Sequence, residues 1–305
     1  MADTINLMHD ECYPSTRRLT TEKPDCFDDS VDGVTTLLKT PDSDQKIAEG
    51  GLRMQEGYKP SSDDKPLITV VTVVYNGVAY LEETIKSTIN QSYENVEYII
   101  VDGGSTDDSL AIIRKYEHAI DYWVSEPDKG IYDAMNKGID LAAGDWINFM
   151  NGGDSFFSPE VLTRVFSNQI HQDIQVLYGN HQVIYQGGRT RWAKGGQVEN
   201  LWKGSQFCHQ ATFVKCKYHK VNKFNVCTKI VADFELFYKA WISDAQFEFI
   251  DIFVARFKAG GVSDIKRIDS ILGHWTIVNK TLKVNSFYLI LVAMEVVKAE
   301  IKRFV

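Results

Sequence analysis

The middle of this chain alternates apolar runs of strand length with stretches that suit helices, and this rhythm limits the possible folds more than any other feature. The runs are residues 68–74, 96–101, 120–124 and 146–150. Such near-continuous apolar runs are typical of buried strands in a parallel sheet. A polar residue closes or closely follows each run, and the four residues lie 26 positions apart: Asn76, Asp102, Asp128 and Asp154. Because loops after parallel strands leave from one edge of a sheet, we expect these side chains to gather in one acid-lined crevice.

Helical periodicity fills the gaps between the runs. Over residues 80–89, Leu81, Ile85 and Ile89 fall on one face of a helix. Similar patterns predict helices over residues 108–116 and 131–141. Strands that alternate with helices predict an α/β fold with a mostly parallel central sheet and flanking helices.

The pattern changes after Asp154. Residues 175–193 alternate around the turn residues Gly187 and Gly188, which predicts a small antiparallel part. Its expected strands are residues 176–178, 182–185 and 190–192. A helix is expected over residues 230–241 and a further strand over residues 247–257.

Charge is distributed unevenly over the 305 residues. Residues 1–64 carry 14 acidic against 7 basic side chains, whereas the remainder is nearly neutral although the whole chain has a net charge of −8. This first part lacks a sustained period, so we expect a largely disordered extension of which only residues 50–59 dock on the domain. Residues 65–275 are the predicted main domain and residues 276–305 a C-terminal helical segment. Without a basic groove, nucleic acid is not an expected partner.

The five cysteines form no C-x-x-C pair. A zinc site made from Cys208, Cys216, His209 and His219 is the alternative to ordinary reduced thiols, but its spacing matches no usual zinc motif. The N-terminus has no basic cluster followed by an apolar core, as a secretory signal would. We therefore expect a cytoplasmic protein with reduced thiols.

The C-terminal residues 287–297 are apolar at ten of eleven positions and a basic end follows them. The run is too short to span a bilayer, which needs about 20 apolar residues. Two hypotheses remain open and equally favoured. The helix packs on the domain or on a second copy in a homodimer, or residues 284–305 lie on an anionic membrane surface as a peripheral contact.

The loops after the strands suit a nucleotide ligand. Glycines after Asp102 let backbone approach a ligand, and the Asp102 carboxylate can accept from a nucleobase or ribose. Lys129 and the following helix start can face a phosphate, with Asp128 near a ribose or sugar. Asp154 in the turn 151–154 suits Mg²⁺ or Mn²⁺. Each loop taken singly also fits a plain turn or helix cap, and neither a dinucleotide fingerprint nor a Walker loop is present.

Four segments together carry a family resemblance: Val70–Asn76, Asp102–Asp107, Asp128–Gly138 and Asn151–Asp154. They resemble the inverting family-2 glycosyltransferases of GT-A (Rossmann-like) fold, most closely bacterial members that build colanic acid, capsule or O-antigen units. The resemblance covers about residues 66–275. It implies a hexosyltransferase of surface polysaccharide biosynthesis that moves a sugar, with inversion, from a nucleotide-diphosphate donor to a glycan or lipid-linked acceptor, at the inner face of the cytoplasmic membrane.

The resemblance also implies site residues. The nucleotide and donor would be bound by Tyr75, Asn76, Asp102, Ser105, Asp128, Lys129 and Asn151. Asp154 would hold Mn²⁺ or Mg²⁺, although Asn151 and Gly153 stand where many relatives have carboxylates. That departure weakens the expected metal site.

An inverting transfer needs a base for the acceptor hydroxyl. The matching segment, residues 231–237, offers Asp233 and Glu235, which lie about 200° apart around a helix and cannot face the same pocket. The resemblance favours Asp233, with a plain helix cap as the alternative. His209 and Gln210 are weaker candidates for contact with acceptor or phosphate. His274, with residues 260–263, is expected on a mobile loop that closes over the diphosphate.

Two other classes of function remain open. One is a nucleotidyltransferase of similar fold, but the loop of residues 75–79 lacks the basic residues such enzymes usually carry there. The other is a sugar-nucleotide-binding protein with a decayed catalytic site, for which the incomplete acidic motif is the support.

Overall fold

The computed structural model describes residues 13–27, 34–261 and 265–304. Within them, one mixed sheet has the strand order β1-β4-β3-β2-β5-β9-β7-β10-β6, and β8 pairs with β7. The strands are β1 (Ala48–Gly50), β2 (Ile68–Val74), β3 (Val96–Asp102), β4 (Tyr122–Ser125), β5 (Trp146–Phe149), β6 (Ser155–Phe156), β7 (Ile174–Ile184), β8 (Thr190–Ala193), β9 (Thr212–Lys215) and β10 (Gln246–Lys258). The α-helices are α1 (Leu81–Ile89), α2 (Ser109–Lys115), α3 (Ile131–Leu141), α4 (Val161–Phe166), α5 (Cys216–Val221), α6 (Ala232–Ile242), α8 (Arg267–Ile277) and α9 (Leu282–Phe304). The short 3-10 helices are η1 (Pro14–Thr16), η2 (Asp25–Phe27), η3 (Leu52–Gln55), η4 (Glu117–Ala119), η5 (Gln186–Gly188), η6 (Val198–Lys203) and η7 (His209–Ala211).

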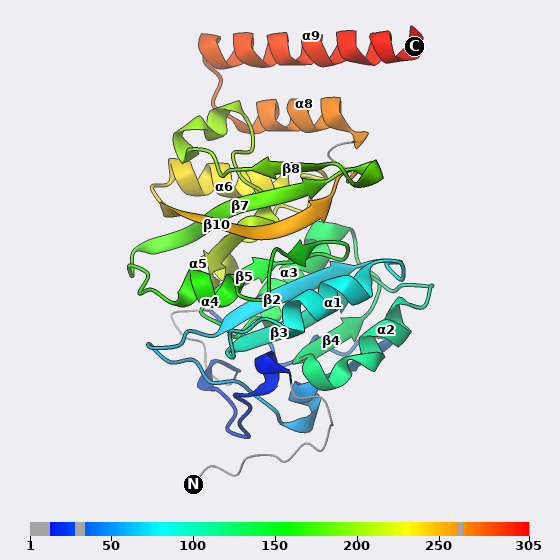
Figure 1. Ribbon diagram of the computed structural model, residues 1–305, viewed down its shortest axis with the longest axis vertical. Coiled ribbons are helices and arrows are strands. Elements are labelled where there is room, and N and C mark those ends of the chain that lie inside the picture. Colours follow the sequence, from blue (N-terminus) through cyan, green and yellow to red (C-terminus); the bar gives the residue numbers. More distant parts are fainter. Residues whose placement is uncertain (1–12, 28–33, 262–264, 305) are drawn as a thin grey trace.

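The parallel half of the sheet matches the prediction. Strands β4, β3, β2 and β5 pair in parallel, and each overlaps one of the four apolar runs. Helices α1, α2 and α3 lie where the periodicity placed them. The carboxyl ends of these strands therefore share one edge, as Figure 1 shows.

Alternate side chains of each central strand enter two separate cores. Val71 and Val73 of β2 pack with Met135 of α3 on one face, whereas Val70 of β2 packs with Ile85 of α1 on the other. Both faces are buried, which explains why the strand sequences are apolar almost throughout. Burial of the large apolar side chains in these cores, each worth about 1.5–3 kcal/mol relative to exposure, fixes the layers.

The second half of the sheet is mixed. β9 pairs antiparallel with both β5 and β7, and β10 runs parallel to β7. The expected hairpin is present, since β7 and β8 pair antiparallel across η5. Gly187 and Gly188 both have φ near 81° there, a conformation that favours glycine. The two strands predicted over residues 176–178 and 182–185 are one continuous strand, β7, because both pieces pair with β10.

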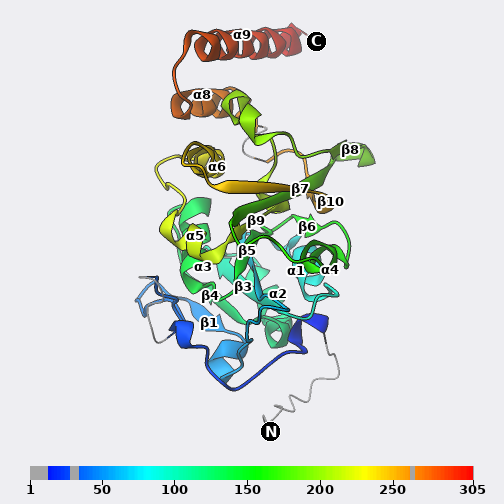
Figure 2. The same cartoon turned by 90° about the vertical axis from the view of Figure 1, so that its left-hand side faces the viewer.

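The described part of the N-terminal segment packs on the domain. β1 pairs antiparallel with β4 at the edge of the sheet, and Figure 2 shows the segment at the end of the molecule opposite α9. Within residues 50–59, the backbone N–H groups of Leu52 and Arg53 each donate at 2.9 Å, to the carbonyls of Ile120 and Asp121, so this part lies against the domain as expected. The expectation of a largely disordered extension does not hold for residues 13–27 and 34–64 as described, while residues 1–12 and 28–33 lie outside the described residues.

Buried ion pairs attach this segment. Lys59 is fully buried and its Nζ lies 2.6 Å from Oδ2 of Asp121. Arg53 pairs in the same way with Glu97 of β3. Burial raises the pKa of Asp121 even though the Lys59 charge opposes the shift. The segment therefore neutralises two carboxylates that the domain would otherwise bury alone.

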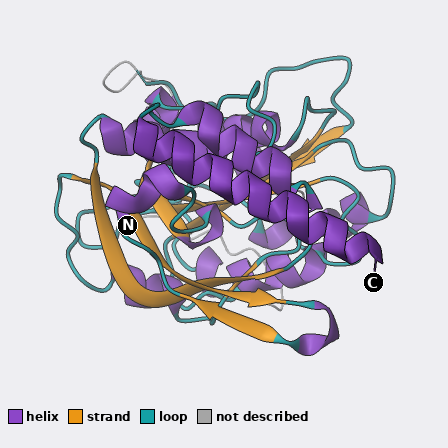
Figure 3. Ribbon diagram, turned by 90° about the horizontal axis from the view of Figure 1, so that it is seen from above, coloured by secondary structure: helices purple, strands orange, loops and turns teal. Residues whose placement is uncertain are grey.

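Helices α8 and α9 close the opposite end of the molecule, and Figure 3 shows α9 lying across it. Tyr288 of α9 is fully buried and stacks on Trp275 of α8. The other face of α9 is exposed and apolar, with Ile290, Val297 and Ile301 each more than half exposed. None of the helices in the described ranges has the length and apolar character needed to cross a bilayer.

Replacing Lys59 with Met should reveal that the N-terminal segment is integral to the fold. The substitution keeps most of the side-chain volume and leaves Asp121 buried without its cation, which costs about 3–5 kcal/mol for a broken buried pair. Urea unfolding should show a correspondingly lower free energy of unfolding. Lys298→Met, which breaks the exposed pair with Glu295, is the matched control and should change stability by less than about 1 kcal/mol. Equal effects of the two substitutions would contradict this account.

Candidate active site

A cavity of about 1230 Å³ opens at the carboxyl edge of the parallel strands. It extends from the loops after β2 and β5 to α6, α8 and the β7–β8 hairpin, and reaches Leu291 of α9. Typical small-molecule sites occupy about 300–1,000 Å³. The cavity is therefore large enough for two substrates at once.

Most of the site residues predicted from the sequence meet in this cavity. Those that line it are Tyr75, Asp128, Asn151, Asp154, His209, Gln210, Asp233 and His274. Those that do not are Asn76, Asp102, Ser105 and Lys129. The predicted gathering of side chains from separate loops is thus present, but only two of the four evenly spaced residues face the cavity.

Asp102 instead holds the loops behind the cavity together. It is fully buried, and its carboxylate accepts hydrogen bonds from the Ser105 backbone N–H at 3.0 Å and from the Ser125 hydroxyl at 2.6 Å. Asn76, at φ 50°, accepts from the Thr106 N–H at 2.8 Å. In this structure these polar groups are committed to the protein itself. Their predicted contact with a nucleotide stays a prediction.

Asp128 lies at the rim of the cavity. Its Oδ1 accepts from the Gly130 N–H at 2.7 Å, and a Cβ at Gly103 would collide with its Oδ2. A side chain at position 103 would therefore displace the Asp128 carboxylate. Lys129 is exposed, and its backbone N–H donates to Asp133 at 3.0 Å.

Asp154 is enclosed at the end of the 151–154 turn. The amide of Gln210 donates from Nε2 to its Oδ2 at 3.0 Å. Burial raises the pKa of Asp154 to about 6, and the hydrogen bond from Gln210 opposes that shift only in part. Because Gln210 is neutral, its hydrogen bond offsets only part of the cost of removing the ionised carboxylate from water.

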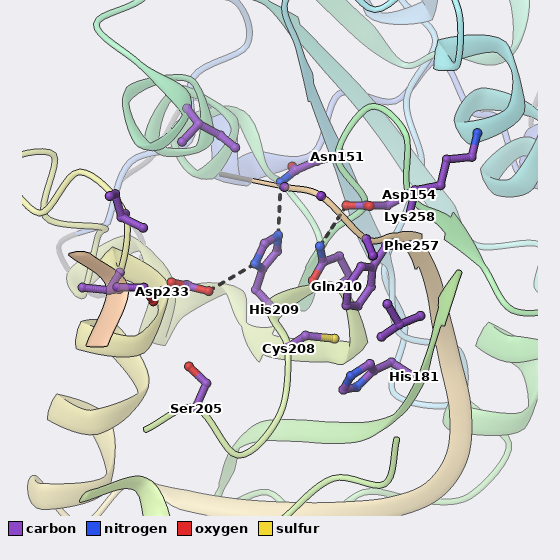
Figure 4. A pocket seen from close by; sticks show the side chains of 18 of the residues that line it. Asn151, Asp154, His181, Ser205, Cys208, His209, Gln210, Asp233, Phe257 and Lys258 are labelled. Atoms are coloured by element: carbon purple, nitrogen blue, oxygen red, sulfur yellow. Dashed lines mark hydrogen bonds and ion pairs between the residues drawn. The ribbon is translucent and has the colours of Figure 1, made fainter. Parts of the chain in front are cut away.

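Asp233 has the opposite environment at the start of α6. His209 Nδ1 lies 3.3 Å from its Oδ2, and the Tyr132 hydroxyl donates to its Oδ1 at 3.1 Å. Burial would raise the pKa of Asp233, but the hydrogen bond from His209 holds it below its ordinary value. Asp233 is therefore ionised near neutral pH and available to accept a proton. Figure 4 shows Asp233, His209 and Asn151 in one connected row.

Glu235 faces away from the cavity, as the helical geometry requires. Its carboxylate accepts from Thr228, Asn225 and Lys239. His274 belongs to α8 and packs its ring 4.2 Å from that of Phe234. The expectation that it sits on a mobile loop is wrong, because α8 is helical from residue 267 onward; residues 262–264 lie outside the described residues. Burial lowers the pKa of His274 to about 4.

The sequence reading missed the side of the cavity formed by the hairpin. His181, Val183 and Tyr185 face it from β7 and its end, and Arg191 faces it from β8. The period-two alternation of a strand was the signal that placed these three side chains on one face. The sequence patterns also did not indicate Tyr132 or the exposed cations around the cavity, which are Arg191, Lys194, Lys203, Lys229, Lys258 and Arg267.

The acidic groups limit what metal the cavity can hold. Across the described ranges, no three side chains of His, Cys, Asp or Glu come together as a metal cluster. Of the turn residues that line the cavity, Asn151, Gly152 and Asp154, it is Asp154 that carries a carboxylate. Mg²⁺ is commonly held by one or two carboxylates together with substrate phosphates. Asp154 therefore suits a cation that is also held by the diphosphate of a substrate. It does not suit a metal site made of protein ligands alone.

Comparison with known proteins agrees with this fold and cavity. Residues 69–235, more than half of the chain, match the family model for glycosyl transferase family 2. The chain is 29% identical over 209 residues to a PGL/p-HBAD biosynthesis glycosyltransferase of Mycobacterium bovis, covering 65% of this chain and 80% of that protein. It is 42% identical over 100 residues to an uncharacterized glycosyltransferase of Mycobacterium tuberculosis, covering 32% of this chain and 38% of that one.

Two solved structures share the architecture. Staphylococcus aureus TarS in complex with UDP superposes with a TM-score of 0.52 at 16% identity, covering 73% of this chain and 69% of that one. The mannosyltransferase PcManGT of Pyrobaculum calidifontis, in complex with GDP-Man and Mn²⁺, gives 0.55 at 15% identity over 74% and 70%. At such identities the likeness is one of fold, and it confirms the predicted α/β class.

The fold, the cavity and the matches define an enzyme that transfers sugars, a hexosyltransferase. The chain belongs to glycosyl transferase family 2. The family assignment decides against the nucleotidyltransferase that the sequence had left open.

Asp154→Asn should stabilise the ligand-free protein at neutral pH. The raised pKa means that the folded state takes up a proton as the pH falls through about 6, whereas the unfolded chain does so near 4. Ionised Asp154 therefore destabilises the fold above pH 6, by at most about 3 kcal/mol, and has no such effect below pH 4. Thermal unfolding should show a gain for the variant at pH 7.5 that disappears by pH 4. The exposed Asp173→Asn is the control, and a gain independent of pH would refute the assignment.

Proposed function

We propose that this protein transfers a sugar, with inversion, from a nucleotide-diphosphate donor to an acceptor hydroxyl, and that Asp233 is the general base. The observation that carries the proposal is the position of Asp233: an ionised carboxylate in the same cavity as the loops after β2 and β5. A single base opposite the donor suits direct displacement. Asp233 takes the proton of the acceptor hydroxyl while the hydroxyl oxygen bonds to the anomeric carbon. At the same time the bond from that carbon to the diphosphate breaks, and the nucleotide diphosphate leaves with the electron pair.

The donor is proposed to lie along the carboxyl edge of β2, β3 and β5. Tyr75, Asp128 and Asn151 line that part of the cavity, and Asp102, Ser105 and Asn76 hold the loops that shape it. Solved structures of similar fold carry UDP, UDP-GlcNAc or GDP-Man, which supports a nucleotide sugar as donor. The positive charge of Lys129, near the start of α3, would attract the phosphates of the donor.

A divalent cation, Mn²⁺ or Mg²⁺, is proposed to accompany the donor. Asp154 would hold it by one carboxylate, and PcManGT of similar fold contains Mn²⁺. When bound, such a cation neutralises charge that develops on the leaving diphosphate. Gln210 holds the Asp154 carboxylate in place from the other side.

The acceptor is proposed to be a glycan with an anionic, lipid-linked end. The exposed cations Lys203 and Arg267 line the cavity together with the apolar Ile271 and Leu291 of α8 and α9. Cations suit a phosphate and apolar side chains suit a lipid. The M. bovis relative, by its name, acts in PGL/p-HBAD biosynthesis.

Replacing Asp233 with Asn tests the base directly. The amide keeps the size of the carboxylate but cannot take up the proton, so turnover should fall about 10²–10⁴-fold, the usual contribution of general-base catalysis. A thermal-shift screen of UDP and GDP sugars with Mn²⁺ first identifies the donor, because a ligand bound to the folded state raises its stability. Glu235→Gln on the opposite face of α6 is the control. Wild-type turnover in Asp233→Asn would remove Asp233 as the base, and a protein that binds a donor without any turnover would be a binding module.

The exposed face of α9 is proposed to rest on a membrane that presents the acceptor. The cavity reaches Leu291 on the same helix, so a bilayer that covers Ile290, Val297 and Ile301 would lie beside the acceptor end. Lys283 and Lys298 flank this face and favour anionic lipid.

Ile290→Asp with Val297→Asp should abolish binding to phosphatidylglycerol vesicles, because a charge on this face opposes entry into the headgroup region. Vesicle sedimentation measures the bound fraction. Val221→Asp, at an exposed valine of α5, is the matched control and should leave binding unchanged. The membrane proposal fails if the wild type does not bind vesicles and light scattering shows a lower molar mass for the double variant than for the wild type. That result would mean that α9 contacts a second copy of the chain.

A further inference from the structure

His209 connects the two halves of the cavity. Its Nε2 lies 3.1 Å from Nδ2 of Asn151 in the donor-side turn, and its Nδ1 lies 3.3 Å from Oδ2 of Asp233 on α6. Both ring nitrogens are therefore used by protein groups. The ring is well enclosed, with 17% of the His209 side chain exposed.

The orientation of the Asn151 amide, with Nδ2 toward the ring, favours one tautomer of His209. The Asn151 amide nitrogen is a donor, so Nε2 of His209 must accept from it. A neutral imidazole that accepts at Nε2 carries its proton at Nδ1, where it donates to Asp233. The Tyr132 hydroxyl donates to the other carboxylate oxygen, at 3.1 Å. The Phe234 backbone N–H is a further donor to this carboxylate, and the Tyr132 hydroxyl also lies 3.2 Å from the Ile230 carbonyl oxygen.

On these contacts, and resting on the proposed role of Asp233, we propose that His209 is a positioning residue. It orients the Asp233 carboxylate, favours its ionised form and ties the base to the 151–154 turn that holds the donor. The neighbouring Gln210 secures Asp154 of the same turn. The segment of residues 209–210 therefore sets the distance between donor and base.

The groups that face Asp233 come from several elements. His209 comes from η7, Tyr132 from α3 and His274 from α8. The Cys208 thiol is adjacent, and burial raises its pKa to about 12, so it stays neutral. Burial also raises the pKa of Tyr132, which keeps its proton and its donor role. His209 is thus the main polar group that counters the burial of Asp233.

Two substitutions separate positioning from simple packing. In His209→Asn the amide nitrogen takes the place of Nδ1 and still reaches Asp233, whereas in His209→Gln the amide takes the place of Nε2 and does not. The pKa of Asp233, followed by carboxyl ¹³C NMR without any substrate, should rise in the Gln variant and rise less in the Asn variant. The acidic limb of the pH profile of turnover should move to higher pH in the same order. His171→Gln, a surface histidine paired with Asp173, is the control.

Imidazole ¹⁵N NMR of the wild-type protein gives a second readout that needs no variant to fold. The proposal requires a proton on Nδ1 and none on Nε2 of His209. A proton on Nε2 alone, or equal pKa values for Asp233 in wild type, Asn and Gln variants, would overturn the role of His209. Those results would leave the transfer reaction untouched, whereas wild-type turnover in Asp233→Asn would remove the base and the role of His209 with it.

Discussion

The pairing of β5 with β9 is the contact on which the site depends. The chain reverses direction here, so the parallel half of the sheet meets the mixed half. Asn148 of β5 is fully buried, and its amide donates to the carbonyls of Gln210 at 3.0 Å and Thr212 at 2.9 Å. These bonds place η7 beside the loop that follows β5. Asn151 and Asp154 then lie within reach of His209 and Gln210, although almost sixty residues separate them in sequence.

Local sequence patterns were sufficient for the parallel half of the fold. Each apolar run became a strand because both faces of the sheet are covered, and the helices followed from their periodic apolar faces. The choice between Asp233 and Glu235 also rested on local sequence, because the helical angle between them places the two side chains on different faces of one helix. The pairing of His209 with Asp233 was beyond such reasoning. It depends on how α6 docks against η7, and side-chain spacing along the chain carries no trace of that docking.

The N-terminal segment shows where composition misleads. Its acidic, aperiodic sequence suggested disorder, yet Arg53 and Lys59 are buried against acids of the domain. A signal for this was present in residues 96–101, where Glu97 stands in an otherwise apolar strand and is itself buried. A charge in such a place needs a buried partner. Arg53, which lies outside the predicted domain, is that partner.

The environments of the two cavity carboxylates push their pKa values apart. Asp154 has an amide as its neighbour, and burial raises its pKa to about 6. Asp233 has His209 and Tyr132, and its pKa stays below the ordinary value. Two acids so separated can take different roles at one pH. Asp233 is therefore ionised, which suits its proposed role as base, whereas burial of the Asp154 carboxylate favours a ligand that brings positive charge. The burial that raises the pKa of Asp154 therefore supports the proposal that a cation binds there together with the donor, in the same cavity as the proposed base.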